Sequence, residues 1–168
     1  MLIVAALLAP GSAWAAAGDV GCIATKLGAP IMQRIGNGVA AAVTAGSDPA
    51  RALDTDRDAF IAARDACRSA HNWSPDAVEA AVSYTQARAT KLGVESALKA
   101  EGADTAKLNG IYDGLLLADR KSLIAKVSSS VLRVIAAAGA NPTQRRHVLL
   151  YFAALAGLEF YPADFTAA

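Results

Sequence analysis

Four aspartates between residues 54 and 65 have a spacing that could bind a calcium ion. Asp54, Asp56 and Asp58 occupy the first, third and fifth places of an EF-hand loop, and Asp65 occupies its last place. Calcium takes several oxygen ligands, and such a loop supplies them from these places. Ile61 stands at the eighth place, which is apolar in the pattern.

The same segment departs from a calcium loop in two respects. The sixth place, where glycine permits a sharp turn, is Ala59, and Asp65 is shorter than the bidentate glutamate of the pattern. Phe60, Ala63 and Cys67 also recur at helical spacing, which predicts a helix that begins before the loop would end. We therefore favour acidic residues near a helix start, where they interact well with the helix dipole, over a metal site.

One of the two histidines belongs to the basic triplet Arg145, Arg146 and His147. Together these side chains could contact an anion or a carboxylate of a partner protein. A solvated first turn of a helix explains the same triplet, and we favour that interpretation. The other histidine, His71, lies at a predicted helix end, where an imidazolium can interact with the last carbonyl groups.

Met32 and His147 could supply the thioether and imidazole that hold haem in some helical proteins. The chain has no C-x-x-C pair for covalent haem attachment. Methionine commonly fills irregular gaps in a core, so we predict that Met32 does so. We expect no cofactor.

Arg88, Lys91 and Glu95 are spaced to share one face of a helix, where they could bind an anionic substrate. A solvated face with salt bridges is the simpler interpretation. No G-x-S-x-G motif is present, and residues 128–130, all serine, fall inside a predicted helix without a neighbouring base. We therefore predict no catalytic residues and favour a protein that is not an enzyme.

Residues 1–15 have the pattern of a secretory signal peptide. An apolar run from Met1 to Ala9 is interrupted by Pro10, and Ala13-Trp14-Ala15 provides an A-x-A site for cleavage after Ala15. The run is too short to cross a bilayer, which needs about 20 apolar residues. We expect a periplasmic or secreted protein without a transmembrane segment after cleavage.

Cys22 and Cys67 are the two cysteines, and in an exported chain they are expected to form one disulfide. Closing a loop of this length stabilises the fold by about 4 kcal/mol in the chain-entropy treatment. Free thiols or a metal site are the alternatives, but two cysteines without clustered histidines fall short of a zinc ligand set. A lipid anchor on Cys22 is disfavoured because Asp19 lies where a lipid-attachment signal is apolar.

Residues 16–168 have the length and composition of a single all-helical domain. Hydrophobic residues make up 54% of the chain and aromatic residues only 6%, because alanine dominates, and alanine favours helix over strand. The formal net charge is +1, with both signs mixed along the chain. Nucleic-acid binding is therefore not expected, since it requires a concentrated basic patch.

Hydrophobic periodicity and capping residues predict five or six helices. Pro30 and Gly28 predict a kink in the first, and Ser74 and Asn141 are expected to cap the starts of the third and the last. The third helix is expected to weaken at Gly93. The expected helices cover residues 20–45, 58–71, 75–98, 105–115 and 120–138, followed by one from 142.

Residues 148–158 form an apolar run that ends only at Glu159. A helix that is apolar on every side is normally buried on every side, so we predict that it lies at the centre of the bundle. The alternative is a docking face for a partner or a membrane surface, formed by this helix or by Trp73.

The sequence thus predicts an all-α exported protein, a compact bundle of five to six helices with a central apolar C-terminal helix and one disulfide. Two cysteines on early helices resemble the layout of small periplasmic binding proteins such as acid chaperones and effector-immunity proteins, although architecture does not fix function. The leading hypothesis is a non-catalytic binding or interaction protein of the cell envelope, whose partner is another envelope protein or a second copy. The alternatives are a helical bundle that binds a small molecule or metal ion and, less favoured, a secreted enzyme with an anionic substrate.

Overall fold

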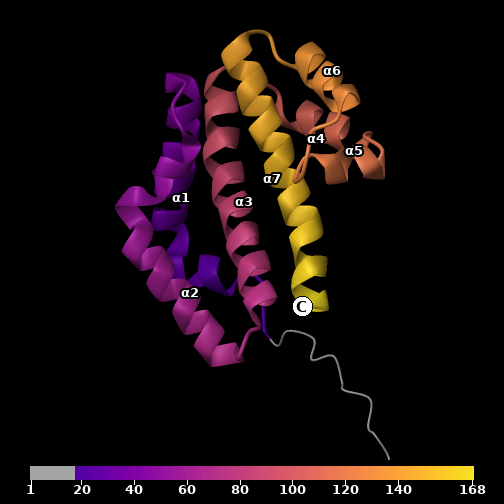
Figure 1. Cartoon of the computed structure of the whole chain (residues 1–168). Coiled ribbons are helices and arrows are strands. Elements are labelled where there is room, and N and C mark those ends of the chain that lie inside the picture. Colours follow the sequence, from indigo (N-terminus) through magenta and orange to yellow (C-terminus); the bar gives the residue numbers. More distant parts are fainter. Residues whose placement is uncertain (1–17) are drawn as a thin grey trace, which may run out of the picture.

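The computed structural model describes residues 18–168, and within them the chain is all-helical, with no strand (Figure 1). The predicted signal peptide, residues 1–15, lies outside the described residues. The elements are α1 (Cys22–Ala45), the 3₁₀ helix η1 (Pro49–Asp56), α2 (Arg57–His71), α3 (Pro75–Ala100), α4 (Thr105–Asp113), α5 (Leu117–Ser122), α6 (Ser129–Ala138) and α7 (Pro142–Ala167). The predicted all-α bundle is confirmed.

Three long helices, α1, α3 and α7, lie side by side, with α3 between the other two (Figure 1). The short helices α4, α5 and α6 gather beside the upper half of α7, while α2 runs along α1. No residue in 147–158 is exposed, so the predicted covering of the last helix is confirmed. Among the three long helices α3 has the middle place, and α7 lies between α3 and the short helices (Figure 1).

Small residues explain why α3 takes the middle position. Gly36 of α1 and Gly93 of α3 lie so close that a Cβ on either would collide with the backbone of the other helix. On the α7 side, a Cβ on Gly157 would lie 2.7 Å from the Cβ of Ala87 in α3. The absence of side chains at these crossings lets the backbones approach, and α3 runs without a break through Gly93.

Local signals in the sequence place several helix ends correctly. Gly28 has φ 74° and kinks α1 just before Pro30. The Ser74 hydroxyl accepts a hydrogen bond from the Ala77 backbone N–H at 3.0 Å and so caps α3. The Asn141 side chain accepts one from the Gln144 N–H at 2.9 Å, which caps α7 as predicted.

The helix expected over residues 120–138 is two helices, α5 and α6, separated by a turn. Ser128 caps α6 by accepting from the Val131 N–H, and the hydroxyls of Ser128 and Ser130 both donate to Asp119 Oδ1, at 2.7 and 2.6 Å. These two hydrogen bonds hold the pKa of Asp119 below its usual value. The serines that were expected inside a helix therefore mark the start of one.

The predicted disulfide between Cys22 and Cys67 is present, with the two Cα atoms 6.1 Å apart. It joins α1 to α2 inside a first apolar core that also contains Trp73, whose ring lies edge-to-face with Phe165 at 5.1 Å. A second apolar core lies among the later part of α3, α7 and the short helices. Its largest fully buried members are Leu98, Tyr151 and Phe152.

Among the described residues α7 is the helix that is long and apolar enough to cross a membrane, judged by length and composition alone. The core helix of a folded domain has the same two properties. Because α7 packs along α3 and its residues 147–158 are covered, we treat it as a core helix.

Candidate functional site

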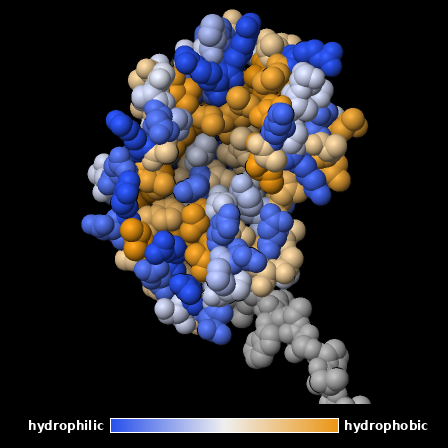
Figure 2. All heavy atoms as spheres, in the orientation of Figure 1, coloured by the Kyte–Doolittle hydropathy of each residue, from blue (hydrophilic) through white to orange (hydrophobic). Residues whose placement is uncertain are grey.

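A cavity of about 550 Å³ opens between α4 and α6, and we call it the α4–α6 groove. The α3–α4 turn and the first turn of α7 complete its wall. Figure 2 shows hydrophobic residues gathered in the upper half of the molecule, where Figure 1 places α6 and the start of α7. The apolar lining consists of Ala103, Leu108, Ile111, Val134, Ala137, Ala138 and Ala140.

Four polar side chains also line the α4–α6 groove, and three of them are engaged within the fold. Asp104 caps α4 by accepting from two backbone N–H groups, at 3.0 and 3.1 Å. Gln144 accepts from the Ala140 N–H, and Glu101 pairs with His147. In the described part of the chain the ammonium of Lys107 makes no ion pair or hydrogen bond, so it is the one lining charge without a partner there.

His147 is fully buried behind the groove and links three helices. Its Nδ1 lies 2.8 Å from Glu101 Oε1, and its Nε2 lies 3.2 Å from the Ala40 carbonyl oxygen and 3.5 Å from Thr44 Oγ1. The two ring nitrogens thus face a carboxylate and a backbone carbonyl, groups that only accept hydrogen bonds. This arrangement ties the start of α7 to the end of α3 and to α1.

The basic triplet Arg145, Arg146 and His147, for which an anion contact was the alternative to a solvated first turn, does not form one surface. Arg145 donates through Nε to the Gly139 carbonyl at 3.1 Å, and Arg146 donates to Thr143 Oγ1 at 3.3 Å while remaining exposed. His147 instead lies in the core. With both of its ring nitrogens engaged, it is also not placed to ligate haem together with Met32, which is buried in the first core.

The four aspartates of the calcium-loop pattern are not brought together. Asp56 is buried and accepts from Arg34 at 2.7 Å, whereas Asp54 and Asp65 each pair with a neighbouring arginine. Asp58 and Asp65 lie on α2, because the segment folds as η1 followed by a helix. Within residues 18–168 no three His, Cys, Asp or Glu side chains are grouped to hold a metal ion.

The face of α3 that was considered for anion binding carries a row of salt bridges, the interpretation that the sequence analysis favoured. Glu95 accepts from Lys91 and from Lys99, and both lysines hold the pKa of Glu95 below its usual value. Lys91 also lies 5.7 Å from the centre of the Tyr151 ring. Arg88 is exposed and is not part of this row. The three residues therefore do not converge as a catalytic pocket would require.

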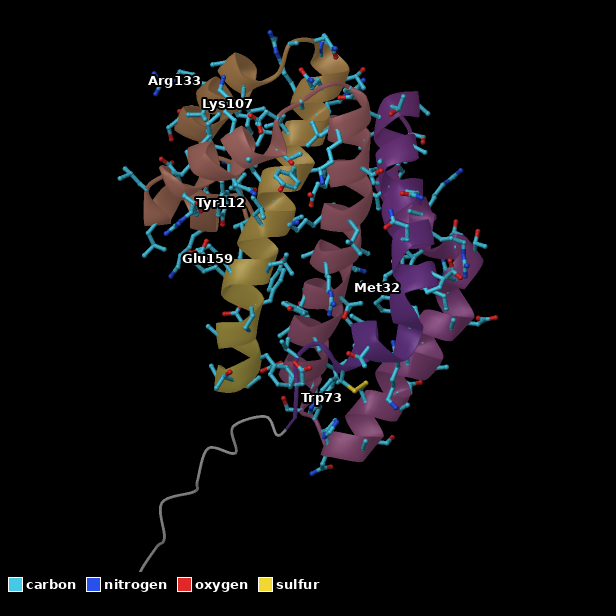
Figure 3. All side chains as sticks on the ribbon, turned by 180° about the vertical axis from the view of Figure 1, so that it is seen from behind. Met32, Trp73, Lys107, Tyr112, Arg133 and Glu159 are labelled. Carbon is cyan, nitrogen blue, oxygen red and sulfur yellow. A yellow bond between two sulfur atoms is a disulfide. The ribbon has the colours of Figure 1, made fainter. Side chains whose placement is uncertain are left out.

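The short helices are attached to α7 by polar contacts that the sequence analysis missed. Tyr112 of α4 donates to Glu159 Oε2 at 2.6 Å, and Arg120 of α5 lies 3.4 Å from the other oxygen of that carboxylate. Burial and the Glu159 carboxylate raise the pKa of Tyr112, which keeps the phenol protonated as a donor. Tyr151 donates to Asn109 at 2.8 Å. Figure 3 shows Tyr112 and Glu159 facing each other between α4 and α7.

Exposed apolar side chains concentrate on the short helices rather than at Trp73. Leu116, Leu117 and Leu132 are 73%, 53% and 49% exposed and are the three most exposed large hydrophobic residues of the described chain. Trp73 is only 4% exposed and stacks on His71 with ring centres 5.7 Å apart. The expectation that Trp73 forms a docking face is therefore wrong, because its ring fills the first core.

Comparison of the chain with protein-family models, with curated proteins and with solved structures finds no match to it. We argue a function from the α4–α6 groove because its walls are mostly apolar and Lys107 on them makes no ion pair within the described residues.

Proposed function

We propose that this chain is an exported, non-catalytic binding protein of the cell envelope that holds a small, largely apolar molecule in the α4–α6 groove. The observation that carries this proposal is a cavity of about 550 Å³ with mostly apolar walls. Ligand sites in proteins are typically concave, apolar and roughly 300–1,000 Å³ in volume, with a few polar groups that orient the ligand.

Two observations support an exported protein. Residues 1–15 carry the signal-peptide pattern, and the Cys22–Cys67 disulfide is typical of an oxidising compartment such as the periplasm.

The use of the polar groups around the groove favours binding over catalysis. Asp104 is a helix cap, Gln144 belongs to the cap of α7, and Glu101 is committed to a fully buried histidine. A general base must reach a proton on the substrate, and His147 has no exposed atom with which to do so. These groups shape the groove rather than act within it.

Titration with Nile red, a neutral apolar dye, tests the proposal. Ala137 lines the groove and is exposed, so Ala137→Phe fills the groove without disturbing the core. Ala136 is its exposed neighbour on α6 outside the lining, and Ala136→Phe is the matched control. We expect dye fluorescence to rise with wild type and with Ala136→Phe but not with Ala137→Phe. Equal binding by the two variants would contradict a site in the groove.

A second candidate function is favoured by the exposed leucines. Leu116, Leu117 and Leu132 could contact another envelope protein or a second copy of the chain, because large exposed apolar groups often mark interaction surfaces. Sedimentation velocity of wild type and of the double variant Leu116→Ser and Leu117→Ser tests self-association. A wild-type dimer that the variant cannot form would support it, and a wild-type monomer at every concentration would contradict it.

A further inference from the structure

The charges on the α4–α6 groove are unevenly compensated. Glu101 has a buried imidazole as its partner, and Asp104 faces the N-terminal N–H groups of α4. Lys107 makes no ion pair within the described residues. Of the three charged side chains on the wall, it is therefore the one that is not engaged within the fold.

A second cation lies near the same end of the molecule. Arg133 is exposed on α6, next to the lining residue Val134, and it makes no ion pair within the described residues. Figure 3 shows Lys107 and Arg133 at one end of the molecule, on α4 and α6, the two helices that form the groove. The two positive charges favour an anion at this end.

The scarcity of free polar groups on the walls restricts the rest of the ligand. Apart from Lys107, the side-chain polar atoms of the lining that make no hydrogen bond within the described residues are one carboxylate oxygen each of Glu101 and Asp104 and the amide nitrogen of Gln144. A peptide would bring many N–H and C=O groups into an apolar groove, and burying them without partners is costly. The groove therefore suits a ligand with an apolar body and a single polar end.

We propose that the ligand is a single-chain amphipathic anion, with an alkyl chain along the apolar walls and an acidic head group at Lys107. This inference rests on the proposed function and names the ligand class of the same site. The Glu101 carboxylate repels an anion, so the head group lies toward Lys107 and Arg133 and the chain extends past Leu108 and Ile111.

Calorimetric titration of the full mature chain with three ten-carbon probes tests the inference: decanoate, 1-decanol and decyltrimethylammonium, each below its micelle concentration. We expect decanoate to bind most tightly and the cation most weakly. Lys107→Gln should weaken decanoate about two- to fivefold, the range of an exposed ion pair, and leave decanol unchanged. Lys26→Gln is the matched control, because Lys26 is an exposed lysine of α1 outside the groove lining.

The outcomes separate this inference from the proposed function. Equal affinities for decanol and decanoate, or equal affinities of Lys107→Gln and Lys26→Gln for decanoate, would contradict an anionic head group and leave binding in the groove intact. If none of the probes binds and Ala137→Phe matches wild type with Nile red, the proposed function fails as well. Weaker decanoate binding in high salt, with unchanged decanol binding, would further support the ion pair.

Discussion

The two ends of this bundle are held together by different kinds of interaction. At the disulfide end, formed by the start of α1, α2, the start of α3 and the end of α7, a covalent bond and the Trp73–Phe165 ring pair fix the helices. At the groove end, formed by α4–α6 with the adjoining turns of α3 and α7, Tyr112–Glu159 and Tyr151–Asn109 attach α4 to α7, and His147–Glu101 ties α7 to the end of α3. Figure 3 shows Trp73 beside the disulfide and Lys107 at the other end.

The difference indicates a division between support and binding. A disulfide reduces the conformational freedom of the unfolded chain and so stabilises the end of the bundle that it joins. Short helices that are held by side-chain hydrogen bonds need less free energy to unfold locally. Elements that admit ligands are drawn from the less stable parts of a fold. The groove and the exposed leucines both lie at the end without the covalent link.

The largest expected effect lies where the two ends meet. Gly93→Ala puts a methyl group into the backbone of α1 at Gly36, and we expect a loss of at least about 3 kcal/mol because the α1–α3 crossing must open. Gly110→Ala in α4 is the control, since a Cβ there meets nothing within 4 Å and helix propensity favours alanine by up to about 1 kcal/mol. Urea unfolding measures the free energy of unfolding of both variants. A mild effect of Gly93→Ala would contradict the claim that the close α1–α3 crossing fixes the position of α3.

Loss of the disulfide should come next. Replacing Cys22 and Cys67 by serine should lower the free energy of unfolding by about 2–5 kcal/mol, the usual cost of removing a native disulfide from a small domain. Nile red binding should survive under conditions where the variant remains folded, because the groove lies at the other end. Loss of dye binding in a folded variant would show that the two ends are coupled.

His147→Phe tests the main polar link of the groove end. The substitution keeps a ring in the core but removes the ring nitrogens that contact the Glu101 carboxylate and the Ala40 carbonyl, and we expect a loss of about 1–3 kcal/mol. Arg146→Gln, one residue earlier and exposed, should change stability by no more than about 0.5 kcal/mol. Thermal unfolding followed by circular dichroism distinguishes them, and equal melting temperatures would argue against a structural role for His147.

The smallest effect concerns alkaline pH. Burial and the Glu159 carboxylate raise the pKa of Tyr112 in the folded protein above the ordinary tyrosine pKa of about 10. The neutral phenol therefore contributes stability that is fully present below about pH 10 and is lost as the pH rises through the raised pKa. Tyr112→Phe should cost about 1–2 kcal/mol at neutral pH and make the alkaline decline less steep. Urea unfolding at a series of pH values measures both, and an unchanged slope would contradict the burial argument.

Features that depend on neighbouring residues could be predicted from the sequence. The kink at Gly28, the cap at Ser74 and the cap at Asn141 each follow from a local preference that the fold does not override. The disulfide could also be predicted, because two cysteines in a chain with a predicted signal peptide leave one pairing. Hydrophobic periodicity was sufficient for the all-helical class.

Features that depend on distant residues could not be predicted. Periodicity joined α5 to α6 because Leu123, Val127 and Val131 keep helical spacing across the turn, whereas Asp119 and the serines that mark the break act through side-chain hydrogen bonds. Gly93 was interpreted as a weak point of α3, although it permits the close approach of α1. The pairing of His147 with Glu101 joins residues far apart in sequence, so the triplet around His147 suggested a surface instead.

Hydrogen–deuterium exchange of the protein with and without decanoate tests the division between the two ends most directly. We expect amides of α4 and α6 to exchange faster than those of α2 and of the start of α1 in the free protein. Decanoate should slow exchange in α4 and α6 and leave α2 unchanged. Slower exchange at α4–α6 than at the disulfide end, or protection by decanoate that falls on α1 and α2, would contradict the assignment of binding to the groove end.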